Sequence, residues 1–337
     1  MRFLIIGGTR FLGRYLVESA KEKGHSITLF NRGKSNPSLF KDIERIIGDR
    51  ENERDLEKLR DKEWDVVIDT CGYTPEIVSK SVEILSNKVG QYIFISSGSV
   101  YKNLFHEDEI NEESEIVTLS KEELDSVTEE KSGRFNQEYY GPLKYLSEQE
   151  VIKKMDGKCL IVRSGLIVGP NDSTDRFTYW PYRVSLGGNI LAPDNEERKV
   201  QFIDVRDLAK WIILMAEKNE TGIFNVTGPK RKLSMGELLH SCKRVLNTDA
   251  NFVWASKDFL VAQNVQPWIE LPLWVPTDSD YGMNFEKAIE KGLEIRPISD
   301  TIRDTFAWNQ NRKLESRRAG LSLEREKDIL KEWFRNH

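Results

Sequence analysis

The first thirteen residues constrain the fold more than any other part of the chain. A short apolar run at residues 1–6 leads into a turn bounded by glycines at residues 7–13. Residues 14–23 then carry apolar side chains at helical spacing, and Gly24 is placed to end a helix. With a second apolar run at residues 26–30, this pattern predicts a strand, a tight turn, a helix and a strand, which is a βαβ unit.

The turn itself suits a pyrophosphate. A glycine after a strand lets the backbone turn sharply, and a glycine at the start of a helix lets the unpaired amides there come close to an anion. We therefore predict a dinucleotide site, although position 10, where many such turns carry a glycine, is Arg10. A turn that serves the fold alone is the alternative. The predicted site consists of Gly7, Gly8, Thr9, Arg10, Phe11, Leu12 and Gly13.

Composition excludes several other classes of protein. The chain has 337 residues, of which 39% are hydrophobic and 31% charged, as is usual for a folded globular protein. It has no apolar stretch of membrane-spanning length and enters a strand directly, so we expect a cytoplasmic protein without a membrane partner. Its three cysteines and four histidines are scattered, which predicts neither a disulfide framework nor a metal site. A net charge of -5 without a basic stripe argues against nucleic acid as the main partner.

The first half of the chain alternates apolar runs with helical stretches. Runs of this kind, long enough for strands buried on both faces, predict an α/β fold with a Rossmann-type, doubly wound parallel sheet. We expect a smaller, interleaved α+β substrate-binding domain, since no linker separates the two parts. The dinucleotide-binding domain is predicted to take residues 1–170 and about 200–230, and the substrate-binding domain about 171–199 and 231–337. The runs that follow the first βαβ unit lie at residues 43–47, 65–69, 91–95 and 159–162.

The end of the second predicted strand bears on the choice of cofactor. An acidic residue usually binds the ribose 2′-hydroxyl of NAD there, whereas this chain has Asn31 and Arg32. A guanidinium can pair with the 2′-phosphate of NADP, and Arg10 in the glycine turn could reach the same group. We therefore predict NADP as the preferred cofactor, with NAD as the alternative if Arg32 is only a solvated turn residue.

A tyrosine and a lysine downstream suggest acid/base chemistry. Tyr140 and Lys144 are four residues apart, so both can lie on one face of a helix. A positive charge near the phenol favours phenolate and lowers a pKa that is ordinarily about 10, so Tyr140 is a plausible acid/base. Tyr139 is a poorer candidate because, five residues from Lys144, it lies on a different side of the helix. Because Pro142 fits only the first turn of a helix, the helix is expected to begin near Tyr140 or to be kinked there.

Together these features resemble the extended short-chain dehydrogenase/reductase superfamily, in its NAD-dependent epimerase/dehydratase group. The resemblance covers the glycine turn, Asp49, Ser97 and the Tyr140–Lys144 pair, and it continues through residues 163–170 and 201–209. It implies that Ser97 hydrogen-bonds the reacting oxygen and that Tyr140 transfers the proton. It further implies that Lys144 binds the nicotinamide ribose and tunes Tyr140, and that Asp49 contacts the adenine.

The resemblance also indicates a subgroup of the superfamily and an oligomeric state. The variant of the glycine turn is most similar to an isoflavone-reductase-like subgroup that has chloroplast RNA-binding relatives. Members of the superfamily often form dimers through the helix that carries the tyrosine, so the resemblance implies a possible homodimer.

Departures from the pattern narrow the expected reaction. Gly98 and Ser99 stand where sugar-nucleotide dehydratases carry an acidic pair, which disfavours dehydration. Val200 stands where nucleotide-sugar enzymes place an arginine for the substrate phosphate, so a UDP-sugar loses support. What remains is hydride transfer between a carbonyl and an alcohol, with or without epimerisation.

Two segments are candidates for the substrate pocket. Residues 176–183 hold four aromatic rings and two arginines, and we predict that Arg176, Tyr179 and Trp180 bind a flat or anionic substrate. Packing of the smaller domain explains these aromatic residues equally well. The acidic stretch at residues 106–131 could be a lid over the pocket or simply a solvated face.

The sequence as a whole predicts an NADP-preferring oxidoreductase or epimerase that acts on a small carbonyl or hydroxyl compound. Ser97, Tyr140 and Lys144 are its predicted catalytic residues. The alternative is a cofactor-binding regulator or an RNA-associated protein in which these three residues are vestigial. Retention of all three and the acidic balance of charge favour the enzyme.

Overall fold

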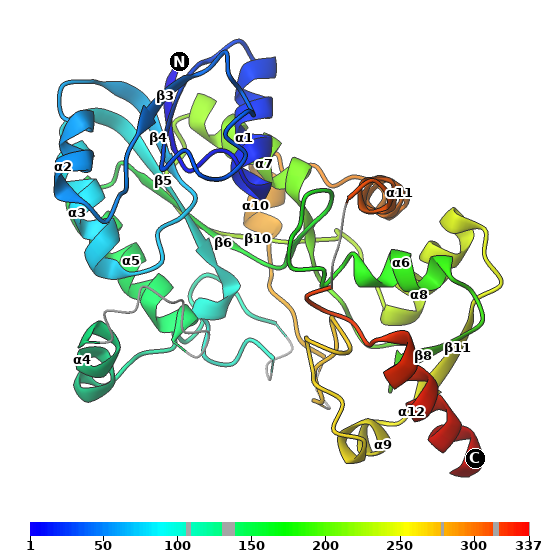
Figure 1. Ribbon diagram of the computed structural model, residues 1–337. Coiled ribbons are helices and arrows are strands. Elements are labelled where there is room, and N and C mark those ends of the chain that lie inside the picture. Colours follow the sequence, from blue (N-terminus) through cyan, green and yellow to red (C-terminus); the bar gives the residue numbers. More distant parts are fainter. Residues whose placement is uncertain (106–108, 130–138, 278–279, 313–316, 337) are drawn as a thin grey trace.

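A parallel sheet of seven strands dominates the computed structural model, which describes residues 1–105, 109–129, 139–277, 280–312 and 317–336 (Figure 1). Each neighbouring pair of its strands is parallel, which confirms the predicted doubly wound Rossmann sheet. In spatial order the strands are β10 (Gly222–Val226), β6 (Cys159–Ser164), β5 (Val89–Ser97), β4 (Trp64–Asp69), β1 (Arg2–Ile6), β2 (Ser26–Asn31) and β3 (Glu44–Ile47).

The direction in which the strands are added reverses beside β1. The chain proceeds from β1 outward to β3, then returns to the other side of β1 and adds β4, β5, β6 and β10. In open α/β sheets, ligands bind outside the carboxyl ends of the strands at the point of reversal. The glycine turn follows β1, so it lies at that point.

Alternate residues of the strands face two separate layers of helices. In β1, Phe3 and Ile5 belong to the hydrophobic core shared with α1 (Phe11–Glu22) and α7 (Val205–Glu217). Leu4 and Ile6 belong to the core on the opposite face, which α3 (Pro75–Leu85) and α5 (Tyr140–Met155) cover. Burial on both faces explains why the strands read as continuous apolar runs. None of the helices in the described ranges is both long enough and apolar enough to cross a membrane.

A second hydrophobic core lies beside the sheet and has its own small sheets and helices (Figure 1). Strand β8 (Asn189–Pro193) pairs with β11 (Asn251–Ala255), and β7 (Ile167–Val168) pairs with β9 (Ile203–Asp204). Ser234 caps α8 (Met235–Leu246) with a capping box, in which its side chain accepts the amide of Glu237 and the Glu237 side chain accepts the amide of Ser234. The helices of this part are α6 (Tyr179–Ser185), α8 (Met235–Leu246), α9 (Lys257–Ala262), α11 (Ile298–Gln310) and α12 (Leu323–Asn336).

One segment packs differently from its predicted assignment. Residues 285–295 include α10 (Glu286–Glu290), and Ala288 and Leu293 are buried in the same core as Phe224 of β10. Lys287 Nζ also donates to a carbonyl of β10 at 2.7 Å. This segment therefore covers the large sheet and not the second core, because its apolar side chains face α7 and β10. The rest of the predicted division into two domains stays a prediction.

Short helices occupy the connections. They are α2 (Glu53–Leu56) and η1 (Glu57–Leu59) after β3, η2 (Gly98–Val100) after β5, and α4 (Lys121–Glu129). Helix α4 lies in the acidic stretch predicted as a lid or a solvated face. Residues 106–108 and 130–131 of that stretch lie outside the described residues. Whether the stretch acts as a lid stays a prediction.

Candidate functional site

The glycine turn brings the start of α1 close to the end of β1. Gly7 and Gly8 have φ angles of +108° and +88°, in the region that favours glycine. A Cβ atom on Gly13 would lie 2.8 Å from the amide nitrogen of Gly8, so only a glycine permits this approach. Within the turn, Thr9 and Leu12 are buried, Arg10 is exposed and Phe11 is partly buried. The turn therefore presents a helix N-terminus at the edge of the sheet, as an anion site requires.

Two asparagine side chains hold the turn in place. Asn31 Nδ2 donates to the carbonyl of Gly7 at 2.7 Å, and Asn36 Nδ2 donates to the carbonyl of Thr9 at 2.7 Å. Asn31 Oδ1 accepts the amide of Gly33 at 2.9 Å. Asn31, predicted as a cofactor contact, thus ties the glycine turn to the residues that follow β2, and this role was not predicted.

The cations predicted to hold a 2′-phosphate lie at the same edge. Arg32 follows β2, its side chain is 58% exposed, and Nη1 lies 3.8 Å from Asp49 Oδ2. Exposed ion pairs of this kind contribute little free energy, so Asp49 would compete weakly with a phosphate for Arg32. Arg10 is also exposed. Both guanidinium groups are therefore accessible to an incoming anion.

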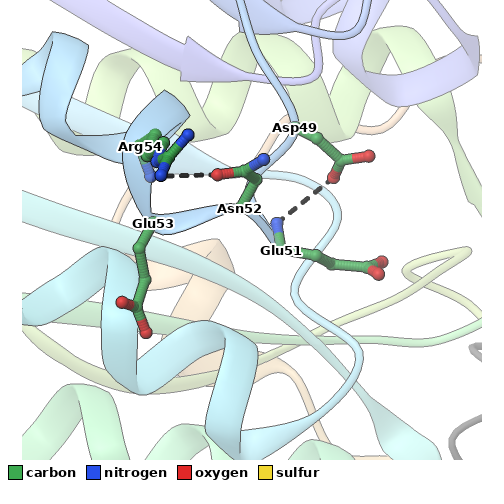
Figure 2. A pocket seen from close by; sticks show the side chains of 5 residues that line it. All are labelled: Asp49, Glu51, Asn52, Glu53 and Arg54. Carbon is green, nitrogen blue, oxygen red and sulfur yellow. Dashed lines mark hydrogen bonds between the residues drawn. The ribbon is translucent and has the colours of Figure 1, made fainter.

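A shallow pocket of about 510 Å³ opens beside Asp49 (Figure 2). Asp49 Oδ1 accepts the amide of Glu51 at 3.2 Å, and Asn52 Oδ1 accepts the amide of Arg54 at 3.0 Å, where it caps α2. Three of its five lining side chains are carboxylates, which makes the pocket unfavourable for a phosphate, and the predicted contact of Asp49 with adenine stays a prediction. The lining residues are Asp49, Glu51, Asn52, Glu53 and Arg54.

Ser97 and Tyr140 meet at the carboxyl end of β5. Helix α5 begins at Tyr140, so Pro142 lies in its first turn, as one of the two predicted alternatives required. A Cβ atom on Gly141 would lie 2.0 Å from the carbonyl oxygen of Ser99, so this glycine lets the helix pack directly on the turn after β5. In that arrangement the side chains of Tyr140 and Ser97 are hydrogen-bonded to each other.

A buried ion pair fixes the helix that carries Tyr140. Glu148, one turn beyond Lys144 on α5, is fully buried and lies 2.8 Å from Nη2 of Arg163 on β6. The hydroxyl of Ser96 also donates to Glu148. These contacts tie α5 to β5 and β6, so the start of the helix is held against Ser97.

Lys144 links the ends of two strands. Its side chain is buried, and Nζ donates to the carbonyls of Gly72 at 2.7 Å and Ile95 at 2.6 Å. The ammonium also lies 4.0 Å from the centre of the Phe94 ring. Burial lowers the pKa of Lys144 to about 8 because the charged form is poorly solvated there.

The electrostatics of Tyr140 differ from the prediction. Burial raises the pKa of its phenol, while the hydrogen bond with Ser97 and the charge of Arg176 act in the opposite direction. The prediction that Lys144 lowers this pKa is therefore wrong for this arrangement. The reason is that the Lys144 ammonium is directed to the carbonyls of Gly72 and Ile95.

We expect Lys144 to make the stability depend on pH in the alkaline range. Its folded pKa of about 8 lies below the ordinary value of 10.5, so the unfolded chain binds more protons than the folded chain between these values. Stability from this group therefore rises with pH through that window. The difference in unfolding free energy between wild type and Lys144→Met should grow by roughly 1–2 kcal/mol from about pH 8 to about pH 10 in urea titrations.

The exposed Lys153 on the same helix supplies the control for this experiment. Lys153→Met removes a lysine from α5 without opening a buried space. If both variants show the same pH dependence, the shifted pKa of Lys144 is refuted.

A buried network near Lys144 was missed from the sequence. Arg50 donates to both carboxylate oxygens of Asp69, at 2.6 and 2.8 Å, and the hydroxyl of Tyr92 donates to Asp69 at 2.9 Å. Asp69 also accepts the amide of Cys71 at 3.1 Å. This bond shapes the turn after β4, in which the carbonyl of Gly72 accepts Lys144 Nζ. The available signal was an aspartate directly after the apolar residues 66–68.

Tyr73 is a second residue that the sequence interpretation missed. Its ring centre lies 5.9 Å from Lys144 Nζ, and its phenol interacts electrostatically with both Tyr140 and Arg10. The ring is exposed and lies beside Lys144, on the side of the sheet that carries the Ser97–Tyr140 pair. Tyr73 comes shortly after the carboxyl end of β4, where ligands of such sheets bind, and this position could have identified it.

The residues predicted to bind substrate separate into two groups. Arg176 is partly buried and interacts electrostatically with Tyr140. Tyr179 and Trp180 are 1% and 0% exposed and belong to the second hydrophobic core. Trp180 Nε1 donates to the carbonyl of Pro272 at 3.0 Å, and its ring contacts that of Tyr179 edge-on. The prediction that these two rings line the pocket is corrected, because both serve packing.

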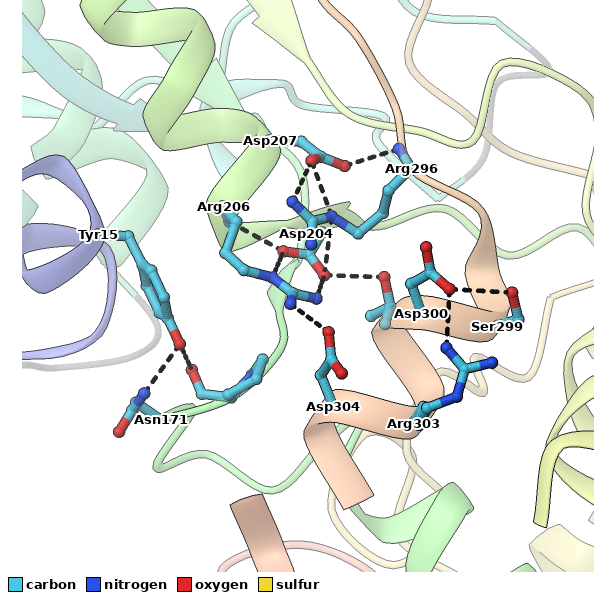
Figure 3. A network of polar contacts seen from close by, with 12 residues as sticks. Tyr15, Asn171, Asp204, Arg206, Asp207, Arg296, Ser299, Asp300, Arg303 and Asp304 are labelled. Carbon is cyan, nitrogen blue, oxygen red and sulfur yellow. Dashed lines mark hydrogen bonds and ion pairs between the residues drawn. The ribbon is translucent and has the colours of Figure 1, made fainter. Parts of the chain in front are cut away.

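The motif at residues 201–209 connects α7 with α11 (Figure 3). Asp204 caps α7 by accepting the amide of Arg206 at 2.9 Å, and it also accepts the hydroxyl of Thr301 at 2.8 Å. The Arg206 guanidinium bridges Asp204 and Asp304 of α11. The motif therefore fastens α7 to α11 and does not extend the site around Tyr140.

The arrangement around Ser97 can polarise and protonate a substrate oxygen. A hydroxyl and a phenol that share a hydrogen bond can both donate to one substrate oxygen when that oxygen replaces their mutual bond, and proton transfer by a positioned side chain is general acid catalysis. The described residues contain no cluster of three or more His, Cys, Asp or Glu side chains that could hold a metal ion. The roles of the individual residues stay predictions.

Comparison with known structures shows the same fold in other proteins. The Bordetella bronchiseptica enzyme WbmH in complex with NAD+ matches with a TM-score of 0.68 and 12% identity, over 93% of this chain and 99% of that chain. The UDP-glucuronic acid 4-epimerase from Bacillus cereus in complex with NAD matches with a TM-score of 0.65 and 16% identity, over 92% of this chain and 99% of that chain. At these identities the likeness concerns the fold.

Sequence comparison identifies the family. The chloroplast stem-loop binding protein of 41 kDa b from Arabidopsis thaliana is 28% identical over 245 residues, which cover 68% of this chain and 59% of that protein. The aligned part is thus less than two thirds of the relative's length. The family model for the NAD dependent epimerase/dehydratase family matches residues 3–227, from β1 to just beyond β10. Because this match covers more than half of the chain, the protein belongs to the NAD-dependent epimerase/dehydratase family.

Proposed function

We propose that the protein is a nicotinamide-dinucleotide-dependent oxidoreductase or epimerase that acts on a small carbonyl or hydroxyl compound. The observation that carries this proposal is the hydrogen-bonded pair of Ser97 and Tyr140 at the edge of the sheet that also holds the glycine turn. Family membership and the NAD complexes of similar fold support the same class of cofactor.

The glycine turn fits such a cofactor. A Cβ atom on Gly7 would lie 2.4 Å from Thr70 Oγ1, and one on Gly8 would lie 2.6 Å from a methyl group of Leu29, so the turn can pack against the sheet only with glycine at both positions. Packed in this way, it presents the start of α1 to a pyrophosphate. In this proposal the turn and the start of α1 hold the pyrophosphate. Lys144, which uses two of its three N–H donors on the carbonyls of Gly72 and Ile95, turns the third to the ribose of the nicotinamide. Asp49 lies at the adenine end. When bound, the cofactor supplies or accepts a hydride.

Side chains of the protein itself transfer the proton. Ser97 and Tyr140 hold the substrate oxygen, and Tyr140 donates its proton as a carbonyl becomes an alcohol. Because burial raises the pKa of Tyr140, the phenol is protonated near neutral pH and is ready to act as the donor. In the reverse direction the phenolate accepts the proton.

Dehydration is not part of this proposal. The resemblance links dehydration to an acidic pair directly after the catalytic hydroxyl, and the positions after Ser97 are Gly98 and Ser99. A Cβ atom on Gly98 would lie 2.4 Å from Met283 Sδ, so a larger residue would have to displace this methionine. The Ser99 hydroxyl lies 3.1 Å from Ser97 Oγ and is neutral.

We propose NADP as the preferred cofactor, on the charges of Arg10 and Arg32. Changing both to Ala should weaken NADPH binding by about 10- to 100-fold, because charge-assisted contacts to a phosphate are lost, and should weaken NADH binding by less than about threefold. Fluorescence titration of the reduced cofactors measures both. The exposed Arg60, which follows η1 and pairs with Glu57, gives a matched control as Arg60→Ala. Tighter binding of NADH than NADPH by the wild type would reassign the preference to NAD.

A screen tests the function directly. Mass spectrometry of the purified protein identifies any dinucleotide that it retains, and NADPH consumption is then followed across a panel of small aldehydes, ketones and keto acids. We expect a bound or readily exchanged dinucleotide and turnover of at least one carbonyl. A protein that binds neither NAD nor NADP would refute the proposal.

Association with RNA is the second candidate function. It is favoured by the similarity to a chloroplast stem-loop binding protein. The net charge of -5 gives little attraction to a polyanion, since nucleic-acid affinity depends largely on phosphate contacts with basic side chains. Gel-shift titration with a stem-loop RNA discriminates between the two functions. Tight RNA binding without turnover of any carbonyl would favour the second.

A further inference from the structure

Arg176 projects from a loop whose backbone is fixed on both sides. Its neighbours Asp175 and Phe177 are 1% and 0% exposed. The Asp175 carboxylate accepts the amide of Arg318 at 3.0 Å and pairs with Arg312, while Phe177 belongs to the second hydrophobic core. Because both neighbours are anchored, the position from which the Arg176 side chain extends is fixed.

The start of the same loop is tied to α1 (Figure 3). Asn171 Nδ2 donates to the hydroxyl of Tyr15 at 2.9 Å, and that hydroxyl donates to the carbonyl of Pro170 at 3.3 Å. Arg14 Nη1 donates to Asn171 Oδ1 at 3.2 Å. Helix α1 begins at the glycine turn, so the loop of Arg176 is positioned relative to the proposed dinucleotide site.

The guanidinium of Arg176 is partly buried yet has few partners. Its Nε lies 3.4 Å from Thr174 Oγ1, and within the described part of the chain no carboxylate lies within ion-pair distance of it. Asp172, whose charge acts on Arg176, already accepts the amide and the hydroxyl of Thr174, at 2.8 and 2.9 Å. A partly desolvated guanidinium with unused donors gains free energy when it binds an anion.

Aromatic rings adjoin this guanidinium. Its central carbon lies 5.8 Å from the centre of the Trp268 ring, which is 5.8 Å from the ring of Phe105. Phe105 in turn meets Tyr281 edge-on at 5.0 Å. Trp268 and Tyr281 lie between α9 and α10, whereas Phe105 follows η2 at the end of β5. Arg176 therefore adjoins this aromatic cluster, and its charge also acts on the phenol of Tyr140.

We infer that Arg176 binds a carboxylate or phosphate group of the substrate while Trp268 and Phe105 contact a flat part of the same molecule. The inference rests on the proposed function, because the anion would be held beside the oxygen that Ser97 and Tyr140 bind. It narrows the substrate to a small anionic carbonyl or hydroxyl compound, either a keto or hydroxy acid or a phosphate ester. A guanidinium offers paired donors that match both anions.

Three probes of similar shape test this inference without turnover. Benzoate, phenyl phosphate and uncharged benzamide are titrated into the full-length protein by calorimetry. We expect benzoate or phenyl phosphate to bind at least about tenfold more tightly than benzamide, as a charge-assisted contact provides. The tighter of the two anions identifies which group the substrate carries. Equal binding of all three probes, or binding of none, overturns the inference.

Variants locate the effect. Arg176→Gln should abolish the preference for the anions, and Arg176→Lys should keep it in weaker form because the charge remains. Arg303→Gln, at an exposed arginine of α11, is the matched control and should bind like wild type. A preference that persists in Arg176→Gln would overturn the assignment to this residue. The comparison among probes in the wild-type protein holds even if a variant fails to fold.

The same samples separate this inference from the proposed function. Titration with NADPH reports on the cofactor site independently of the probes. Cofactor binding without discrimination among the probes would remove only the anion site. Discrimination through Arg176 without binding of any dinucleotide would remove the proposed function and leave the anion site in place.

Discussion

Replacing Tyr140 with Phe should lower turnover by roughly two to four orders of magnitude and leave cofactor affinity within about twofold. The variant keeps the ring that packs at the start of α5 but loses the hydroxyl that is hydrogen-bonded with Ser97. Without that hydroxyl no side chain in the proposed mechanism donates the proton. The rate of NADPH oxidation with a carbonyl found in the screen gives turnover, and fluorescence titration gives cofactor affinity.

Tyr139 provides a closely matched control. It precedes Tyr140 at the N-terminus of α5, is partly buried, and has no role in the proposed proton transfer. Tyr139→Phe should keep most of the activity. If Tyr140→Phe turns over at the wild-type rate, the acid/base assignment is wrong. Equal losses in both variants would indicate damage to the start of the helix instead.

Replacing Arg50 with Met should destabilise the protein by about 3–5 kcal/mol. Asp69 is fully buried, and Arg50 contacts both of its carboxylate oxygens. Removing the guanidinium leaves a charge in a poorly solvated place, where the Tyr92 hydroxyl and the Cys71 amide are its remaining donors. Urea unfolding monitored by circular dichroism measures the change.

Two further variants define the cause of that loss. Removing both charges in Arg50→Met with Asp69→Leu should recover much of the stability, because no unpaired buried charge remains. Arg60→Met, which breaks an exposed pair with Glu57, should leave the unfolding midpoint nearly unchanged. An equally large loss in the double variant would show that the unpaired charge is not the cause, and that packing or the lost bonds to the Tyr92 hydroxyl and the Cys71 amide are.

The pH dependence of the same variant has a definite sign. Burial alone raises the pKa of Asp69, but the charge and hydrogen bonds of Arg50 outweigh it and hold that pKa below the ordinary 3.8. The pair therefore contributes stability above the ordinary pKa, and this is lost as pH falls through the folded value. In Arg50→Met the carboxyl can be protonated more readily, so the deficit relative to wild type should shrink in acid.

The sheet could be predicted because its chemistry is repetitive. A parallel strand covered on both faces must be apolar at nearly every position, so β1, β4 and β5 were visible as unbroken runs. The meeting of Ser97 and Tyr140 was predicted only through the resemblance to a family. Sequence spacing does not show that Gly141 lets α5 pack on the turn after β5.

Other features of the site could not be predicted because they depend on distant partners. Tyr179 and Trp180 have a composition and spacing that suit a pocket wall as well as a core, and only their contacts across the second core distinguish the two. Helical spacing places Lys144 on the same side as Tyr140. It does not reveal that carbonyls at the ends of β4 and β5 compete for the ammonium.

The asparagine that braces the glycine turn limits how the coenzyme preference of this protein could be re-engineered. A common design step introduces an acidic residue at the end of the second strand to favour NAD. Here that residue is Asn31, whose amide nitrogen donates to the carbonyl of Gly7. A carboxylate cannot donate, so it would repel that carbonyl and distort the turn meant to receive the pyrophosphate. Redesign should therefore begin at Arg32, whose side chain extends into solvent and supports no backbone.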